Sequence, residues 1–90
     1  MRAKVVVTSV NPVFADEEKT NQLSENLTFT AVPKNGLYPE DGSDEDNSYA
    51  RWSPSATFSI CVNNPNLWGK FQLGKKYYVD FTEAPDQPVA

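Results

Sequence analysis

The sequence predicts an all-β fold: a small single-domain barrel or sandwich, OB-like or jelly-roll-like, with about five to six short strands. Two triplets of alternating apolar side chains predict it, Phe58/Ile60/Val62 and Tyr77/Val79/Phe81. A period of two places each triplet on one face of a sheet. In addition, a chain of 90 residues makes one domain with a single modest core.

The first strand is expected at residues 4–10, within a valine-rich start. Val5 and Val7 fall on one face of this strand, and Val6 and Val10 fall on the other. Apolar residues on both faces indicate a strand that is covered on both sides. We therefore expect it in the interior of the sheet.

A second strand is expected at residues 27–32, where apolar side chains alternate with threonines until Pro33 ends the strand. The polar stretch before it, residues 16–25, is expected to be a loop. After it, Asn35-Gly36 favours a tight turn, because both positions tolerate a positive φ.

The remaining chain predicts an acidic loop, a short strand at residues 49–52, and the two strands that carry the apolar triplets. The apolar-rich connection at 67–71 is expected to fold back and plug one end of the barrel. The domain should span residues 1–84, followed by an extended tail at 85–90. We assign six residues to the core, where truncation to Ala should cost about 2–5 kcal/mol each: Phe29, Phe58, Ile60, Val62, Val79 and Phe81.

The composition argues against an enzyme. The chain has no histidine and a single cysteine, Cys61, so it lacks the residues for Ser-His-Asp or Cys-His catalysis and for a cysteine- or histidine-ligated zinc. No catalytic residue, metal or cofactor is expected. The start of the chain lacks the apolar region of a signal peptide, and no segment is apolar enough to span a membrane. We expect a protein that is made in a cytoplasm and is not secreted.

Negative charge is concentrated in the first half of the chain, within an overall net charge of −4. Five carboxylates lie in the acidic loop, residues 40–46. Four of them are candidates for contact with a partner: Asp41, Asp44, Glu45 and Asp46. The loop does not match an EF-hand, because the glycine and the final glutamate are missing from their positions. A solvated run of charge, or a contact for a basic partner, explains the loop better.

A second group combines cations with aromatic rings, as single-stranded nucleic-acid binders do. Its members are Arg51, Trp52, Lys70, Lys75, Lys76 and Tyr78. The net negative charge disfavours binding to phosphates. For protein partners, the candidate anchors are Trp52, Trp68 and Tyr78, because interfaces favour aromatic side chains within polar rims.

The C-terminal pattern resembles small proteins of tailed bacteriophages. It begins with the segment at residues 51–56, continues through Asn63-Asn64-Pro65, and closes with Gly69-Lys70, Gly74-Lys75 and the segment Tyr77-Tyr78-Val79-Asp80-Phe81-Thr82. Such proteins begin with a Lys/Val-rich strand and end in a similar G-K-x-x-x-G-x-x-Y-x-V-D-F-T segment. The resemblance implies a phage origin, and with it a location in a phage virion or a host cytoplasm. It transfers no functional residue.

Together these observations predict a non-enzymatic virion component that acts through protein–protein contacts, as a capsid decoration or cement protein or a minor head–tail protein. Its partners would be other virion proteins or a second copy of itself. One alternative is a small acidic phage protein that inhibits a host factor, with the acidic loop as a phosphate mimic. A second alternative is an OB-like single-stranded nucleic-acid binder.

Overall fold

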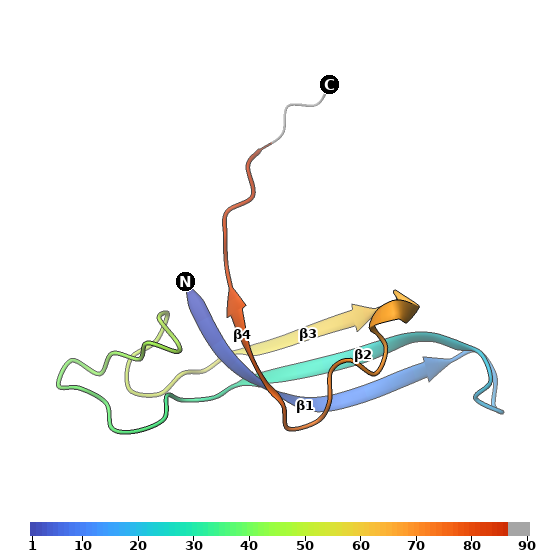
Figure 1. The fold of residues 1–90 in the computed structure, drawn as a ribbon, viewed down its shortest axis with the longest axis horizontal. Helices are drawn as coiled ribbons and strands as arrows, with labels where there is room; N and C mark the ends of the chain where they lie inside the picture. Colours follow the sequence, from blue (N-terminus) through green and yellow to red (C-terminus); the bar gives the residue numbers. More distant parts are fainter. Residues whose placement is uncertain (87–90) are drawn as a thin grey trace.

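The computed structural model describes residues 1–86, and within this range the chain forms one antiparallel sheet of four strands in the order β3-β2-β1-β4 (Figure 1). The strands are β1 (Arg2–Phe14), β2 (Gln22–Ala31), β3 (Thr57–Val62) and β4 (Lys76–Asp80). A 3₁₀ turn, η1 (Pro65–Leu67), follows β3. The all-β class is therefore confirmed.

The expected closure into a barrel or sandwich of about five to six strands is wrong. Among the described residues, β3 and β4 are the two edges of the sheet and do not pair with each other. The expected strand at residues 49–52 reduces to one isolated bridge, between Ser43 and Arg51. Residues 32–56 contain prolines, glycines and acidic side chains in place of an alternating pattern, so they supply no further strand to close the sheet.

The molecule is consequently thin and open. Its extents are 55 × 42 × 17 Å and its radius of gyration is 17.0 Å, whereas a compact domain of this length has about 12 Å. Its accessible surface is 6731 Å², against about 5,300 Å² for a compact chain of the same mass. About 1,400 Å² more surface therefore stays in solvent than in a compact fold of this mass.

β1 lies in the interior of the sheet, as expected, because it pairs with β2 along one side and with β4 along the other. The expected division of its valines is partly wrong. A register shift between Val7 and Ser9 inserts one extra residue opposite β2. The bulge turns Val10 to the same face as Val5 and Val7, where it pairs with Leu27 and packs on the core.

The β1–β2 turn is shorter than the predicted loop, because β2 begins at Gln22. The side chain of Asp16 closes this turn. Its carboxylate accepts hydrogen bonds from the backbone N–H groups of Thr20 and Asn21, each at 3.0 Å, and from the Thr20 hydroxyl. The Asp16 side chain thus supplies hydrogen-bond acceptors for N–H groups that find no backbone partner in the turn. The β1–β2 ladder can therefore continue up to the turn.

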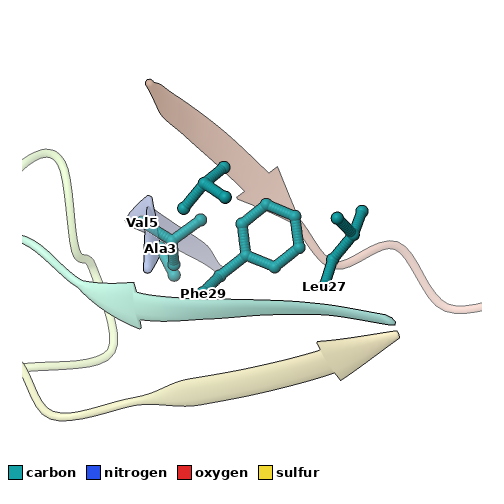
Figure 2. Close-up of a cluster of buried hydrophobic side chains, with 5 residues drawn as sticks. Ala3, Val5, Leu27 and Phe29 are labelled. Carbon is teal, nitrogen blue, oxygen red and sulfur yellow. The ribbon is translucent and has the colours of Figure 1, made fainter. Parts of the chain in front are cut away.

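The two faces of the sheet differ in chemistry. One face, the apolar face, carries the alternating apolar residues of all four strands, and the fully buried core lies on it (Figure 2). Figure 2 shows Leu27 and Phe29 on one side of β2, toward β4. The core consists of Ala3, Val5, Val7, Leu27 and Phe29. The other face, the polar face, carries residues such as Lys4, Thr28, Ser59 and Tyr78.

Most of the predicted core is less buried than expected. Phe29 is buried, but Phe58, Val62 and Val79 are half-buried, and Ile60 and Phe81 are 51% and 50% exposed. The phase of the alternation was correct for these residues. Without closure, however, the edge strands have no second layer of protein above them.

Residues 82–86 are exposed and have no regular secondary structure. Residues 87–90 of the expected tail lie outside the described residues. Within the described range, no helix combines the length and apolar character that crossing a membrane requires.

Candidate functional site

An apolar groove of about 340 Å³ lies on the apolar face and opens to solvent. Val5, Leu27 and Phe29 of the central strands form its floor. Its walls come from β3, β4 and the connection at residues 63–75, through Phe58, Ile60, Val62, Leu67, Phe71 and Tyr77. The side chains that line it are aliphatic or aromatic, so the groove suits an apolar contact rather than acid–base chemistry.

Aromatic contacts hold the two sides of the apolar face together. The ring of Phe58 on β3 lies 6.0 Å from that of Phe81, just beyond β4. Phe71 meets Phe29 edge-on at 5.9 Å and Tyr77 at 5.1 Å. Such offset and edge-on pairs contribute about 0.5–1.5 kcal/mol beyond the area they bury. These aromatic contacts therefore fix the shape of the groove.

The connection at residues 63–75 is held in place by polar contacts. Asn64 caps η1 by accepting from the Asn66 N–H at 3.1 Å. The indole N–H of Trp68 donates to the Val62 carbonyl at 2.8 Å, and the Gly69 N–H donates to the buried Glu25 carboxylate at 3.3 Å. This connection covers part of the apolar face. The sequence predicted that its residues 67–71 would instead plug one end of a barrel. Trp68 is thus half-buried and engaged within the chain.

Large apolar side chains nevertheless remain open along the groove. Ile60 is 51% exposed and Leu67 is 43% exposed. An adjoining hollow of about 230 Å³ lies between Phe58 and Phe81, lined also by Tyr49. Contiguous apolar surface of this kind is typical of a contact site rather than of a free protein surface.

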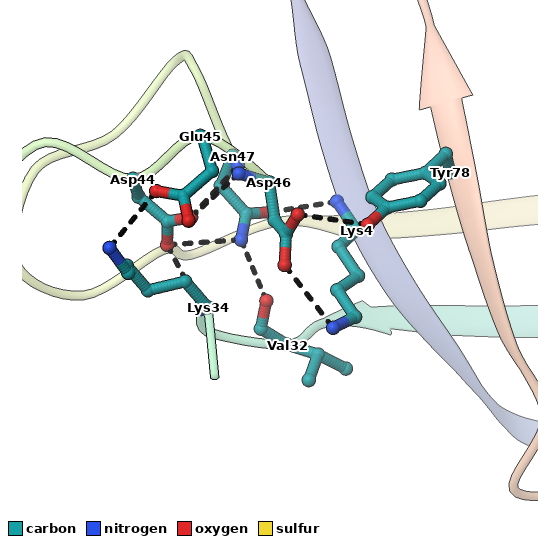
Figure 3. Close-up of polar contacts among 8 residues, drawn as sticks. All are labelled: Lys4, Val32, Lys34, Asp44, Glu45, Asp46, Asn47 and Tyr78. Carbon is teal, nitrogen blue, oxygen red and sulfur yellow. Dashed lines mark hydrogen bonds and ion pairs between the residues drawn. The ribbon is translucent and has the colours of Figure 1, made fainter. Parts of the chain in front are cut away.

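At one end of the sheet, the end of the acidic loop docks beside β1, where Asn47 is fully buried (Figure 3). Its side-chain oxygen accepts from the Lys4 N–H at 2.8 Å, and its amide nitrogen donates to the Val32 carbonyl at 2.7 Å and to Asp44 at 3.2 Å. Next to it, Ser48 exchanges hydrogen bonds with the backbone of Arg2. Residues 47 and 48 therefore take the place of β2 beside the first residues of β1.

Asp44 holds the loop in this position. It is 3% exposed, and its carboxylate accepts from the backbone N–H groups of Lys34, Asp46 and Asn47 at 3.0–3.2 Å. A buried carboxylate with several N–H donors is stable because each lone pair finds a partner. The acidic loop is therefore a structural element at this residue.

Asp46 links the loop to both β1 and β4. It accepts from the Tyr78 hydroxyl at 2.8 Å and pairs with the Lys4 ammonium at 3.2 Å. Beside it, Arg2 forms a two-contact ion pair with Asp80, at 2.7 and 3.2 Å, and its guanidinium lies 4.6 Å from the centre of the Tyr78 ring. We call the five residues Lys4, Asp44, Asp46, Asn47 and Tyr78 the polar clamp.

The hydrogen bonds around the clamp shift the pKa values of Asp46, Tyr78 and the neighbouring Asp80. The hydrogen bond from Tyr78, with the nearby Lys4 ammonium, holds the pKa of Asp46 below its ordinary value. The same hydrogen bond raises the pKa of the Tyr78 hydroxyl. The hydrogen bond from Arg2 lowers the pKa of Asp80. All of these groups therefore keep their neutral-pH charge states in the fold.

Trp52 lies in the loop before β3, on backbone with a positive φ of 64°. Its ring lies against the backbone of Gly42, where an added Cβ would come within 2.5 Å of the indole, and 6.0 Å from the ring of Tyr38. It is still 53% exposed. One face of the ring therefore stabilises the loop and the other remains open.

The predicted interaction residues are thus found in separate places. Asp41 and Glu45 are exposed, whereas Asp44 is buried and Asp46 is engaged in the clamp. The predicted solvated run of charge therefore applies to Asp41 and Glu45 but not to Asp44 and Asp46. Glu45 also pairs with the Lys34 ammonium at 3.0 Å.

The cation–aromatic group is also divided. Arg51 and Trp52 lie in the loop before β3, and Lys70 lies after η1. Lys75, Lys76 and Tyr78 lie at or within β4, where Lys76 and Tyr78 belong to the polar face. The cations are exposed but come from three different segments.

Sequence reasoning did not identify Asn47, Lys4 or Arg2 as structural residues, nor Leu67 as part of a groove. The spacing of Asp44 and Asn47 is a usable signal, since an aspartate often binds backbone N–H groups two and three residues ahead. No local signal marks the groove, because it results from the failure of the sheet to close.

Within residues 1–86, no three Asp, Glu or Cys side chains are grouped so as to hold a metal ion. Comparison of the chain with known proteins found no matching family model, no significantly similar curated protein and no significantly similar solved structure. The groove and the clamp are therefore the features of the chain from which a function can be inferred.

Proposed function

We propose that this protein is a non-enzymatic virion component of a tailed phage, a capsid decoration or cement protein or a minor head–tail protein, that binds a neighbouring virion protein through the apolar groove. The observation that carries the proposal is the open apolar face. Ile60, Leu67 and Phe81 are each 43–51% exposed around aromatic walls that are already in place.

The apolar face supplies side chains that a contact could bury. Ile60 and Leu67 at the groove and Phe81 at the adjoining hollow each keep 43–51% of their surface in solvent. The groove has a fixed shape, so binding would cost little ordering of the chain. An apolar segment of a virion neighbour, with one or two aromatic or branched side chains, would fit it.

The thin shape also suits this role. A sheet 17 Å thick with its loops held by the polar clamp presents one face outward without adding bulk. The phage assignment itself comes from the resemblance of the C-terminal segment.

The host-inhibitor alternative draws its support from the exposed carboxylates of Asp41 and Glu45. Mimicry of phosphates would require several free carboxylates in one row. The carboxylates of Asp44 and Asp46 instead accept hydrogen bonds from donors within the chain. The virion contact therefore has the stronger physical basis.

Quantitative mass spectrometry of purified particles, from a tailed phage that encodes this chain, tests the proposal. We expect many copies in each particle. Leu67→Asp, which places a charge in the groove, should reduce the copy number, whereas Leu73→Asp should not, because Leu73 is exposed outside the groove. Absence of the chain from particles would refute the virion role, and equal loss with both variants would refute the groove as the contact.

A further inference from the structure

The two edges of the sheet differ in how they are protected. β4 carries Lys76 and Asp80, and Asp80 is paired with Arg2. β3, with the sequence TFSICV, contains no charged residue and no proline. Natural sheets usually protect their edges with charges, prolines or bulges, so an edge without them is a site for strand pairing.

The backbone groups on the free edge of β3 can be identified from the ladder. The Ala31 N–H donates to the Ala56 carbonyl at 2.9 Å, and such hydrogen-bonded pairs recur every second residue in an antiparallel ladder. Phe58, Ile60 and Val62 therefore direct their N–H and C=O groups toward β2. The N–H and C=O groups of the three alternate residues, Thr57, Ser59 and Cys61, point away from the sheet.

These three residues suit a close approach of another strand. All three are exposed, small and uncharged, and their side chains lie on the polar face, away from the groove. Among the described residues, none of them takes part in a hydrogen bond beyond the β2–β3 ladder. β3 as a whole is a six-residue strand without charge or proline, and such a strand is a good template for pairing.

We propose that two copies of this chain associate through β3, in an antiparallel, two-fold symmetric pair centred on Ser59. In this register Ser59 faces its own copy, Thr57 faces Cys61, and Phe58 faces Ile60 on the apolar face. The pairing satisfies the free backbone groups on both copies. It also places each half-exposed Ile60 against an aromatic ring, which is a favourable cross-strand pair.

The occupant is a second copy because the edge is complementary to itself. A two-fold interface needs one patch that matches its own rotated copy. In the Ser59 register the bulky Phe58 faces Ile60, and the small residues Thr57, Ser59 and Cys61 face one another. Centring on Ser59 also keeps η1 and Pro65 beyond the paired residues. This inference concerns the edge of β3 and does not depend on the virion role.

The test is the mass of the purified full chain by light scattering, combined with cysteine cross-linking. We expect a dimer. In a Cys61→Ser background, Ser59→Cys should form a disulfide-linked dimer on mild oxidation, because hydrogen-bonded partners have Cα atoms about 5.5 Å apart, within the range for a disulfide. Thr57→Cys with Cys61 retained should cross-link as well. Lys76→Cys in the Cys61→Ser background is the matched control on the β4 edge and should not.

A charge-swap pair tests the same register without cross-links. Ser59→Lys and Ser59→Glu should each weaken self-association by up to about fivefold, since like charges then face each other across the two-fold axis. An equimolar mixture of the two variants should restore the dimer. Circular dichroism should show an unchanged fold, because Ser59 is exposed.

A monomer at all concentrations would overturn the proposal. So would a dimer in which Ser59→Cys cross-links no faster than the Lys76→Cys control, or growth into filaments, which indicates β3-to-β4 pairing.

Discussion

The polar clamp and the apolar face differ in how completely their side chains find partners within the chain. On the clamp side, the buried polar groups of Asp44 and Asn47 find their partners within the chain. On the apolar face, Phe29 is buried while Ile60 and Phe81 remain half exposed. The difference indicates that the fold is stabilised internally by the clamp and the core, and that the outer part of the apolar face is available to a partner.

The largest expected effect separates the floor of the groove from its rim. Phe29→Ala should lower the free energy of unfolding by about 4 kcal/mol, because it removes a buried aromatic ring from the core. Ile60→Ala should lower it by about 1 kcal/mol or less, since half of that side chain is in solvent already. Urea denaturation of the purified chain measures both. Equal losses would mean that Ile60 belongs to the core and would remove the distinction.

The next effect tests the clamp. Asn47→Ala should lower the free energy of unfolding by about 3 kcal/mol, because the Lys4 N–H and the Val32 carbonyl lose their partner in a buried place. Asn63→Ala, at an exposed position, is the matched control and should change stability by about 0.5 kcal/mol or less. If the two variants unfold at the same urea concentration, the acidic loop does not contribute to the fold.

A smaller effect is expected from acid. The pKa values of Asp46 and Asp80 are lowered in the fold by Tyr78 and Arg2, so the unfolded chain takes up protons first as the pH falls. The stabilisation from these groups is complete above the ordinary aspartate pKa of about 4 and is lost progressively below it.

Urea midpoints measured between neutral pH and about pH 3 should therefore fall, and Asp46→Asn should make the fall shallower. The Asp46→Asn variant should at the same time be less stable at neutral pH, because the amide cannot pair with the Lys4 ammonium. An identical pH profile for the variant and the parent chain would show that Asp46 is not engaged.

The predictable part of the fold is the part that depends on local alternation. The phases of β2, β3 and β4 followed from their apolar period, and the interior position of β1 followed from its valines. The position of Val10 did not, because a bulge changes the face of every residue beyond it and leaves no local mark in the sequence.

Closure and the site were beyond local reasoning for a related reason. Whether β3 and β4 meet depends on the loops between strands, and the triplet with Ile60 looks the same in a closed barrel and in an open sheet. The acidic loop suggested solvated charge, yet Asp44 is buried, and one of its donors, the Lys34 N–H, lies ten residues away in sequence. Such partners become visible only in three dimensions.

The central claim is that the apolar groove is a contact surface, and site-specific photo-cross-linking tests it most directly. A benzoylphenylalanine would replace Leu67 in the groove or Leu73 outside it, and phage particles or infected cells would be irradiated. We predict an abundant adduct with one defined protein from position 67 and little from position 73. No adduct from position 67, or equal adducts from both positions, would contradict the account.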